Sequence, residues 1–378
     1  MMKRIESIDI MRGISIMGIL FMNIVGFHMN EVFTNPLDYF QLPLDRILYY
    51  FDILFVHNSF YPIFSFLFGF ALAIMATNIR QRGGNFIPVL YRRVLALLVF
   101  GYIHGLLIFY GDILNVYAVL GMIAILFLLM PNIVSLITAI IIAVIFLLIN
   151  LMVIITVILS PEAIPFEASD NTAQHWIQVM QSGDFSQILA QNQQFFLENF
   201  TTLSLTGIFG YGFSVLPFIL FGMYAMRADM IGFMLKTKRV MMIIAAVSLI
   251  LGLLIKYYVI YAHLDIYAAQ SFIFYGGTLV AICYFIAVVL LTDNQQFYKV
   301  MQPFRYAGKM SFTLYILQSI CMFVIFYVFR LYAKLNLYEV FIIALLIIIF
   351  ELAIATYYMK RYKYGPLEWI WRKITYLK

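Results

Sequence analysis

Residues 133–160 read IVSLITAIIIAVIFLLINLMVIITVILS, and this stretch decides the fold class. It contains no charged residue and exceeds the roughly 20 apolar residues that a helix needs to cross the hydrocarbon core of a bilayer. The rest of the 378-residue chain is similar, since 64% of its residues are hydrophobic and only 11% are charged. Soluble domains have about 45–50% apolar and about 25% charged residues. The sequence therefore predicts an all-α, polytopic membrane helix bundle and excludes a soluble globular protein.

The same template fits other parts of the chain, so about ten transmembrane helices are expected. Their approximate bounds are 13–28, 58–77, 89–110, 113–130, 133–160, 201–225, 240–261, 271–291, 311–330 and 338–358. They divide the chain into an N-terminal bundle (1–160), a polar loop (161–200) and a C-terminal bundle (201–378). The short gap at 110–112 fits either a tight turn between two spans or a break inside re-entrant helices.

Lysine and arginine set the orientation, because both are enriched on the cytoplasmic side of membrane proteins. With the N-terminus inside, most of the 24 Lys and Arg residues fall in the cytoplasm, and the acidic loop 161–200, which contains none of them, falls outside. Both termini are therefore expected in the cytoplasm of a multi-pass protein of the cell membrane. Because the basic residues lie at membrane edges, nucleic acid is not expected as a partner.

Polar residues inside membrane spans are costly and are candidates for function. In the first span, Asp9 and Arg12 are three residues apart, and Asn23 follows eleven residues after Arg12. These spacings are close to one and three helical turns, so the three side chains share one face and Asp9 is expected to pair with Arg12. This face is expected to look into the bundle.

The third predicted span repeats the arrangement, because Arg93 and His104 are also eleven residues apart and Asp112 follows at the outer end. His104 could be a functional group, or it could donate a structural hydrogen bond to a helix packed against Gly101 and Gly105. Asp112 could act with His104 or merely cap the next helix.

Other ionisable residues are expected to have ordinary roles. His28 and His57 flank the first external loop and are expected in solvent, while Lys256 is expected to extend toward the membrane surface. Glu351, midway along the last span, needs a partner, for which Gln318 or Lys309 are candidates. The two cysteines lie in apolar runs, and no metal site is expected.

Several sequence blocks, in order, resemble the YeiB-like bacterial membrane proteins, whose C-terminal half is a domain of unknown function. The blocks are RIESIDIMRG at 4–13, FSFLFG at 64–69, GYIHG at 101–105, GKMSFTLY at 308–315 and GPLEW at 365–369. The N-terminal half is also similar to transmembrane acyltransferases, which include heparan-α-glucosaminide N-acetyltransferase and bacterial O-acetylases of surface sugars. Those enzymes transfer an acyl group from cytosolic acyl-CoA to an acceptor on the far side of the membrane.

The resemblance implies acyl-CoA, in particular acetyl-CoA, as the acyl donor and an envelope glycan or lipid-linked molecule as the acceptor. Membrane lipid is expected around the protein. The oligomeric state stays open, with a homodimer as one alternative. Under this interpretation Arg12, Arg92 and Arg93 would bind the phosphates of CoA. Their position near the inner membrane boundary also fits simple anchoring of the helices. His104 would be the general base that deprotonates the acceptor, with Asp112 orienting it.

The first span departs from the O-acetylases, which carry His where this chain has Asn23. Asn23 cannot act as a base, so its expected role is to donate a hydrogen bond to the developing oxyanion. The alternative function is a multi-pass transporter or lipid-handling permease, in which the same polar residues line a path and no bond is made. A scaffold in a membrane complex is a third hypothesis.

Overall fold

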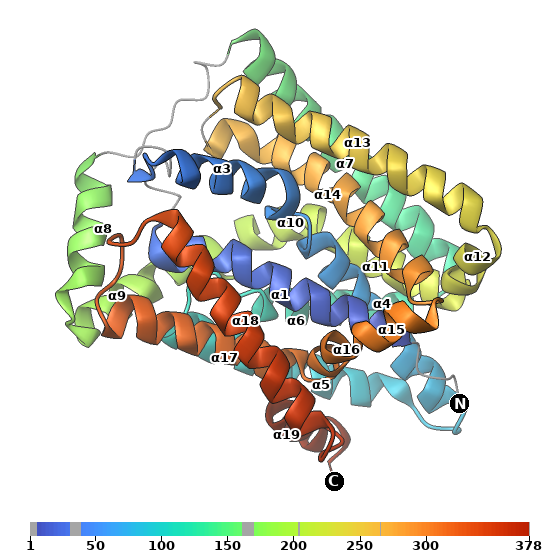
Figure 1. Cartoon of the computed structure of the whole chain (residues 1–378). Helices are drawn as coiled ribbons and strands as arrows, with labels where there is room; N and C mark the ends of the chain where they lie inside the picture. Colours follow the sequence, from blue (N-terminus) through green and yellow to red (C-terminus); the bar gives the residue numbers. More distant parts are fainter. Residues whose placement is uncertain (1–5, 31–38, 161–169, 203–204, 265, 378) are drawn as a thin grey trace.

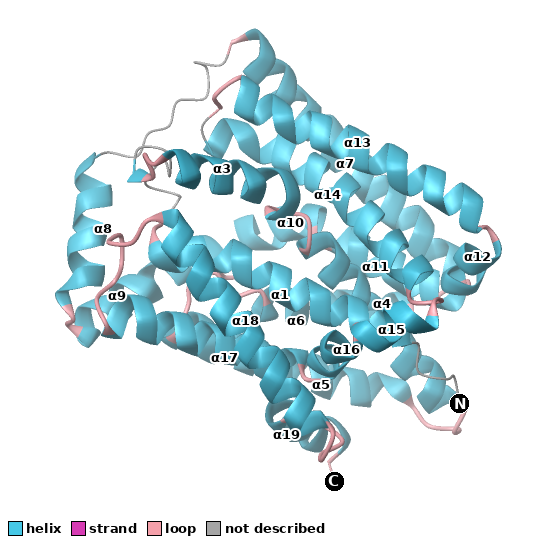
Figure 2. Ribbon diagram, in the orientation of Figure 1, coloured by secondary structure: helices cyan, strands magenta, loops and turns pink. Residues whose placement is uncertain are grey.

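A computed structural model describes residues 6–30, 39–160, 170–202, 205–264 and 266–377. Every regular element in these ranges is a helix, and none is a strand (Figures 1 and 2). The all-α prediction is confirmed.

Eight helical segments in the described ranges are long and apolar enough to cross a membrane, or nine if one bent pair is counted as a single span. The eight are α1 (Glu6–His28), the segment Pro43–Arg80 that ends in α4 (Tyr61–Arg80), α5 (Phe86–Leu107), α7 (Asn132–Leu159), α13 (Lys238–Tyr261), α14 (Ile266–Leu291), α17 with η4 (Ser311–Phe323, Val324–Val328) and α18 (Leu337–Met359). The bent pair is α10 (Leu205–Ser214) with α11 (Leu216–Arg227), at an angle of 41°. The remaining predicted span, 113–130, corresponds to α6 (Leu114–Phe127), whose 14 residues are short for a full crossing.

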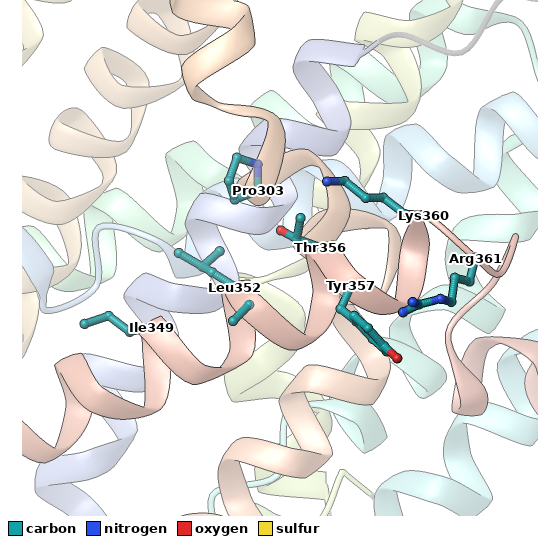
Figure 3. Close-up of a pocket in the computed structure, with 8 residues that line it drawn as sticks. Pro303, Ile349, Leu352, Thr356, Tyr357, Lys360 and Arg361 are labelled. Atoms are coloured by element: carbon teal, nitrogen blue, oxygen red, sulfur yellow. The ribbon is translucent and has the colours of Figure 1, made fainter.

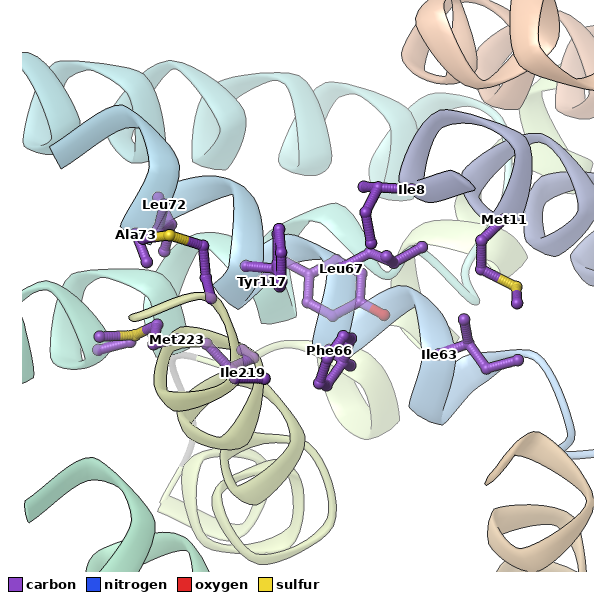
Figure 4. Close-up of a cluster of buried hydrophobic side chains, with 14 of the residues drawn as sticks. Ile8, Met11, Ile63, Phe66, Leu67, Leu72, Ala73, Tyr117, Ile219 and Met223 are labelled. Atoms are coloured by element: carbon purple, nitrogen blue, oxygen red, sulfur yellow. The ribbon is translucent and has the colours of Figure 1, made fainter. Parts of the chain in front are cut away.

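The centre of the bundle is an apolar core formed mainly by α1, α4, α6 and α11. Figure 4 shows Met11 of α1, Phe66 and Leu67 of α4, Tyr117 of α6 and Ile219 of α11 within this cluster. These side chains are nearly inaccessible to solvent, the most exposed being Phe66 at 7%. Their packing fixes α1, which carries Asp9, Arg12 and Asn23, and α6, which begins just after Asp112.

Short helices lie at the ends of the spans. They are α12 (Met230–Lys236), α15 (Gln295–Val300), α16 (Gln302–Lys309) and α19 (Pro366–Tyr376). Helix α16 packs closely on α1 because Gly13 and Gly308 face each other, and a Cβ at either position would collide with the backbone of the other helix. This close approach brings the start of α1 against the C-terminal part of the chain.

The described part of the predicted loop 161–200 is helical. It forms α8 (Asp170–Ser182), α9 (Phe185–Phe195) and the π-turn η3 (Phe196–Phe200). Trp176 and Phe196 are buried against Tyr110 and Tyr102, and Asn192 donates hydrogen bonds to the carbonyls at the end of α5. Figure 1 shows α8 and α9 on the side of the bundle away from α19 and from the start of α1.

The segment before α4, predicted as a loop, contains α3 (Pro43–Phe51) and the π-turn η1 (Asp52–Val56). Helix α3 buries Asp45, whose carboxylate accepts from the backbone N–H of Tyr338, and exposes apolar side chains on its opposite face. The exposed apolar residues are Leu44, Ile47 and Phe51. An amphipathic helix of this kind suits a position along the membrane surface.

Candidate functional site

The centre of the candidate site is a buried pair formed by His104 and Asp112. Helix α5 carries His104 near its C-terminal end, and the chain then turns back so that Asp112 lies just before α6. The Nδ1 atom of His104 lies 2.8 Å from Oδ1 of Asp112, and both side chains are almost completely inaccessible to solvent. Gly101 leaves room for the turn, because a Cβ there would lie 2.8 Å from Oδ2 of Asp112.

Asp112 is itself held in place by a chain of hydrogen bonds. Its Oδ2 accepts from the backbone N–H of Asn115 at 2.8 Å and from the Asn115 side chain at 3.1 Å. Oδ1 of Asn115 in turn accepts from the Thr202 hydroxyl at 2.9 Å. Asp112 therefore orients His104 and caps the start of α6 at the same time.

Of the two ring nitrogens of His104, Nε2 is the one that Asp112 does not contact. A carboxylate that accepts from Nδ1–H fixes the tautomer in which Nε2 carries the lone pair. Among the described residues, Nε2 has no hydrogen-bond partner. An imidazole oriented in this way has the chemistry needed to accept a proton at Nε2.

Tyr315, on α17, lies beside this pair and was not singled out as a functional residue from the sequence. Its ring centroid is 5.0 Å from that of His104, and its hydroxyl accepts from the N–H of Ile113 at 3.4 Å. Its only signal in the sequence is the block at 308–315, more than 200 positions from His104. Nothing in the spacing of either residue indicates that the two side chains meet.

A cavity of about 300 Å³ reaches Tyr315 from the end of the bundle where α1 begins. The cavity is formed mainly by residues of α1, α4, α5, α6, α16, α17 and α19, and its wall is mostly apolar. His104 does not line the cavity, but its neighbours Tyr315 and Ile113 do. The mouth is cationic, with Arg12, Arg93, Lys309, Lys363 and Arg372 in its lining.

The three arginines predicted to bind CoA have different surroundings. Arg12 lines the cavity, lies 3.6 Å from Asp9, and donates to the Gly308 carbonyl at 3.5 Å. Arg93 also lines the cavity, with its guanidinium 3.5 Å from the centroid of the Trp371 ring. Arg92 lies outside the lining.

Arg92 and Asn23, like His104 and Asp112, do not line the cavity. The Nε of Arg92 donates to the carbonyl of Thr375 at 3.1 Å, which ties α5 to α19. Asn23 is half-buried in the second half of α1 and makes no hydrogen bond to the described residues.

Two expectations about isolated charges are wrong. Lys256 does not extend outward, because it is fully buried and its Nζ donates to the His57 carbonyl at 2.6 Å and to the Ser59 hydroxyl at 2.9 Å. Buried Asp52 lies next to this group and 3.5 Å from Nδ1 of His57. His28 is only 1% exposed, since it packs between aromatic rings and accepts from the N–H of Leu335.

Glu351 has the partner expected for a carboxyl group in the membrane. The side chain of Gln318, one of the two candidates, donates to Oε2 of Glu351 at 2.7 Å, and both residues are buried. In the described ranges, no three His, Cys, Asp or Glu side chains cluster in a way that could hold a metal ion.

Two further grooves lie on the surface of the spans. One, of about 680 Å³, lies between α1, α3 and α18 and has almost entirely apolar walls. The other, of about 640 Å³, lies along the end of α18, and Figure 3 shows Leu352 and Tyr357 in its lining with Lys360 and Arg361 at its end. Neither contains residues predicted to act in catalysis.

Three proteins are similar to this chain, and none has an assigned activity in its name. "Uncharacterized protein YxaH" of Bacillus subtilis (strain 168) is 28% identical over 99% of this chain and 95% of its own length. An "Uncharacterized 39.9 kDa protein in amylase 3'region" of Bacillus acidopullulyticus is 25% identical over 99% of this chain and 94% of its own. "Uncharacterized protein YeiB" of Escherichia coli (strain K12) is 35% identical over 32% of this chain and 30% of its own.

A family model described as "Protein of unknown function (DUF418)" matches residues 225–378, which run from the end of α11 through α19. This range contains Tyr315 and the basic residues that α16 and α19 bring to the cavity mouth. The predicted resemblance to YeiB-like proteins with a C-terminal domain of unknown function is confirmed, since residues 225–378 match the DUF418 family model.

Proposed function

We propose that the protein is a transmembrane acyltransferase, which moves an acyl group from cytosolic acyl-CoA to a glycan or lipid-linked acceptor on the other side of the cell membrane. The observation that supports this proposal is the cavity that leads from a cationic mouth to Tyr315, directly beside the oriented His104–Asp112 pair. A transfer across the membrane needs a donor site at one end and a base deep within the bundle.

In the proposed reaction, Nε2 of His104 accepts the proton of an acceptor hydroxyl or amine. The freed electron pair attacks the thioester carbonyl carbon, the C–S bond breaks, and the proton passes to the departing CoA thiolate. Asp112 stabilises the imidazolium form of His104 that exists between these two proton transfers. The acceptor would approach from the side of α8 and α9, where Asp112 lies.

The oxyanion needs a hydrogen-bond donor, for which the sequence suggested Asn23. Tyr315 is better suited, because it lines the cavity and its hydroxyl, which accepts from Ile113, keeps its own proton free to donate. We therefore propose Tyr315 as the oxyanion donor in place of Asn23.

The first prediction tests the base. Purified His104→Gln protein should fold and bind acetyl-CoA but turn it over about 10²–10⁴ times more slowly, which is the usual contribution of a general base. The assay measures release of free CoA from acetyl-CoA in the presence of membrane glycans. His175→Gln, at an exposed position of α8, is the matched control and should keep full activity. Equal activity of the two variants would contradict the assignment of His104.

A permease without covalent chemistry is the second candidate. The observation that favours it is the pair of buried ionisable groups that acyl transfer does not use, Lys256 near Asp52 and Glu351 with Gln318. Charged groups inside spans often mark ion or substrate pathways. If wild-type protein neither binds nor cleaves acyl-CoA, this second function replaces the first.

A further inference from the structure

Two arginines at the cavity mouth have their flat faces covered by aromatic rings of the C-terminal segment. The guanidinium of Arg93 lies 3.5 Å from the Trp371 ring centroid. That of Arg372 lies between two tyrosines, 4.8 Å from the ring of Tyr364 and 4.7 Å from that of Tyr376. All five residues line the same cavity.

A guanidinium whose faces are covered in this way keeps its N–H donors at its edge. Cation–π contacts hold the side chain in one orientation, so less conformational freedom is lost when the edge binds a ligand. The planar fork of donors matches the two oxygens of a carboxylate or phosphate. The stacked arginines are therefore preorganised for an oxyanion.

No carboxylate of the described residues pairs with the stacked arginines. In the part of the chain that the structure describes, Arg93, Lys363 and Arg372 form no ion pair with Asp or Glu. The single carboxylate in the cavity lining, that of Glu368, already accepts from the N–H groups of Phe312 and Thr313 at the start of α17. Three cations thus face one cavity whose single lining carboxylate forms no ion pair with any of them.

The C-terminal helix is fixed firmly enough to form part of a binding site. The indole N–H of Trp371 donates to the Arg93 carbonyl at 2.8 Å, and Arg92 donates to the Thr375 carbonyl at 3.1 Å. These bonds dock α19 against α5 from opposite directions. Arg92 is thereby a positioning residue for the mouth of the cavity.

We propose that the cavity-lining cations of residues 363–376, Lys363 and Arg372, form with Arg93 the anion-binding arm of the cavity, and that this arm binds the diphosphate of an adenine nucleotide. More than one cation converges there, which favours a multiply charged diphosphate over a single carboxylate. The identity of the nucleotide as the CoA end of the acyl donor rests on the proposed function. The anion site itself can be tested without any acyl transfer.

The test measures binding of coenzyme A and of ADP, which carries the same diphosphate, to the purified full-length protein by isothermal titration calorimetry. Arg372→Gln removes one stacked guanidinium, and because Arg372 is exposed the fold should survive, as an unchanged melting temperature would verify. The matched control is Lys373→Gln, at the next position of α19, also exposed but outside the cavity. We expect Arg372→Gln to raise the Kd for coenzyme A about 10-fold to 100-fold and Lys373→Gln to leave it within about twofold.

Equal Kd values for the two variants would overturn the proposal. A phospholipid headgroup offers the same phosphate chemistry, so the titration is repeated in nanodiscs of phosphatidylcholine and of phosphatidylglycerol. If coenzyme A binding is lost in phosphatidylglycerol nanodiscs but kept in phosphatidylcholine nanodiscs, the arm binds a lipid headgroup, and the assignment of a nucleotide is overturned. Binding that depends on Arg372 in a protein that never cleaves acetyl-CoA would support the arm while overturning the acyl transfer, so the two failures are distinguishable.

Discussion

At the scale of single residues, Asp112 matters because its two carboxylate oxygens bind different partners. Oδ1 meets His104, while Oδ2 accepts from the Asn115 backbone and side chain. An asparagine at position 112 would keep the side-chain volume. Its N–H₂ group, however, would face a donor, either the ring of His104 or the N–H of Asn115, and could not accept a hydrogen bond from it. The imidazolium would also lose its counter-charge.

Asp112→Asn should therefore reduce turnover of acetyl-CoA by about 100-fold or more, with coenzyme A binding unchanged. Single-turnover release of CoA separates the chemical step from binding. Asp184→Asn is the control, since Asp184 is an exposed N-cap of α9 and Asn caps helices equally well. If both variants retain full turnover, Asp112 serves only to cap α6.

At the scale of elements, glycines control how closely helices approach. Gly308→Ala adds a Cβ that would collide with the backbone of Asp9, so α16 must move away from α1. Overpacking of this kind costs about 1–3 kcal/mol. The melting temperature in detergent should fall, and coenzyme A binding should weaken because Arg12 and Lys309 flank this contact.

Gly212→Ala on α10 is the matched control, because a Cβ there would meet nothing within 4 Å. In open space, alanine should stabilise a helix by up to about 1 kcal/mol relative to glycine. A melting temperature lowered equally by both substitutions would mean that the contact of α1 with α16 is not tightly packed.

Elements also explain which parts of the structure could be predicted from sequence. Long apolar helices such as α7 are predictable, because the length of an apolar run suffices to identify them. Helices α3, α8 and α9 were missed, since their stability comes from a buried face against the spans and not from a long apolar run. The His104–Asp112 pair could be predicted, because the two residues are only eight positions apart in the sequence. The contact of α19 with α5 could not, because it depends on tertiary packing that the spacing of residues does not indicate.

At the scale of the whole molecule, the proposed transfer requires a fixed orientation in the membrane. The cationic cavity opens where α1 begins and α19 lies, and the helices α8 and α9 lie on the other side (Figure 1). If acyl-CoA enters at the mouth, that side must face the cytoplasm, as the distribution of Lys and Arg predicts.

Cysteine labelling of intact cells tests this orientation. In a background with Cys283 and Cys321 replaced by Ala, a membrane-impermeant maleimide should modify Ser186→Cys on α9 and spare Gln296→Cys on α15, both of which are exposed positions. Permeabilising the cells should make both react, which controls for accessibility. The reverse pattern would put the cationic mouth outside the cell, where acyl-CoA is absent. Acyl transfer from CoA would then be untenable even if His104 and Asp112 were essential, because the donor could not reach them.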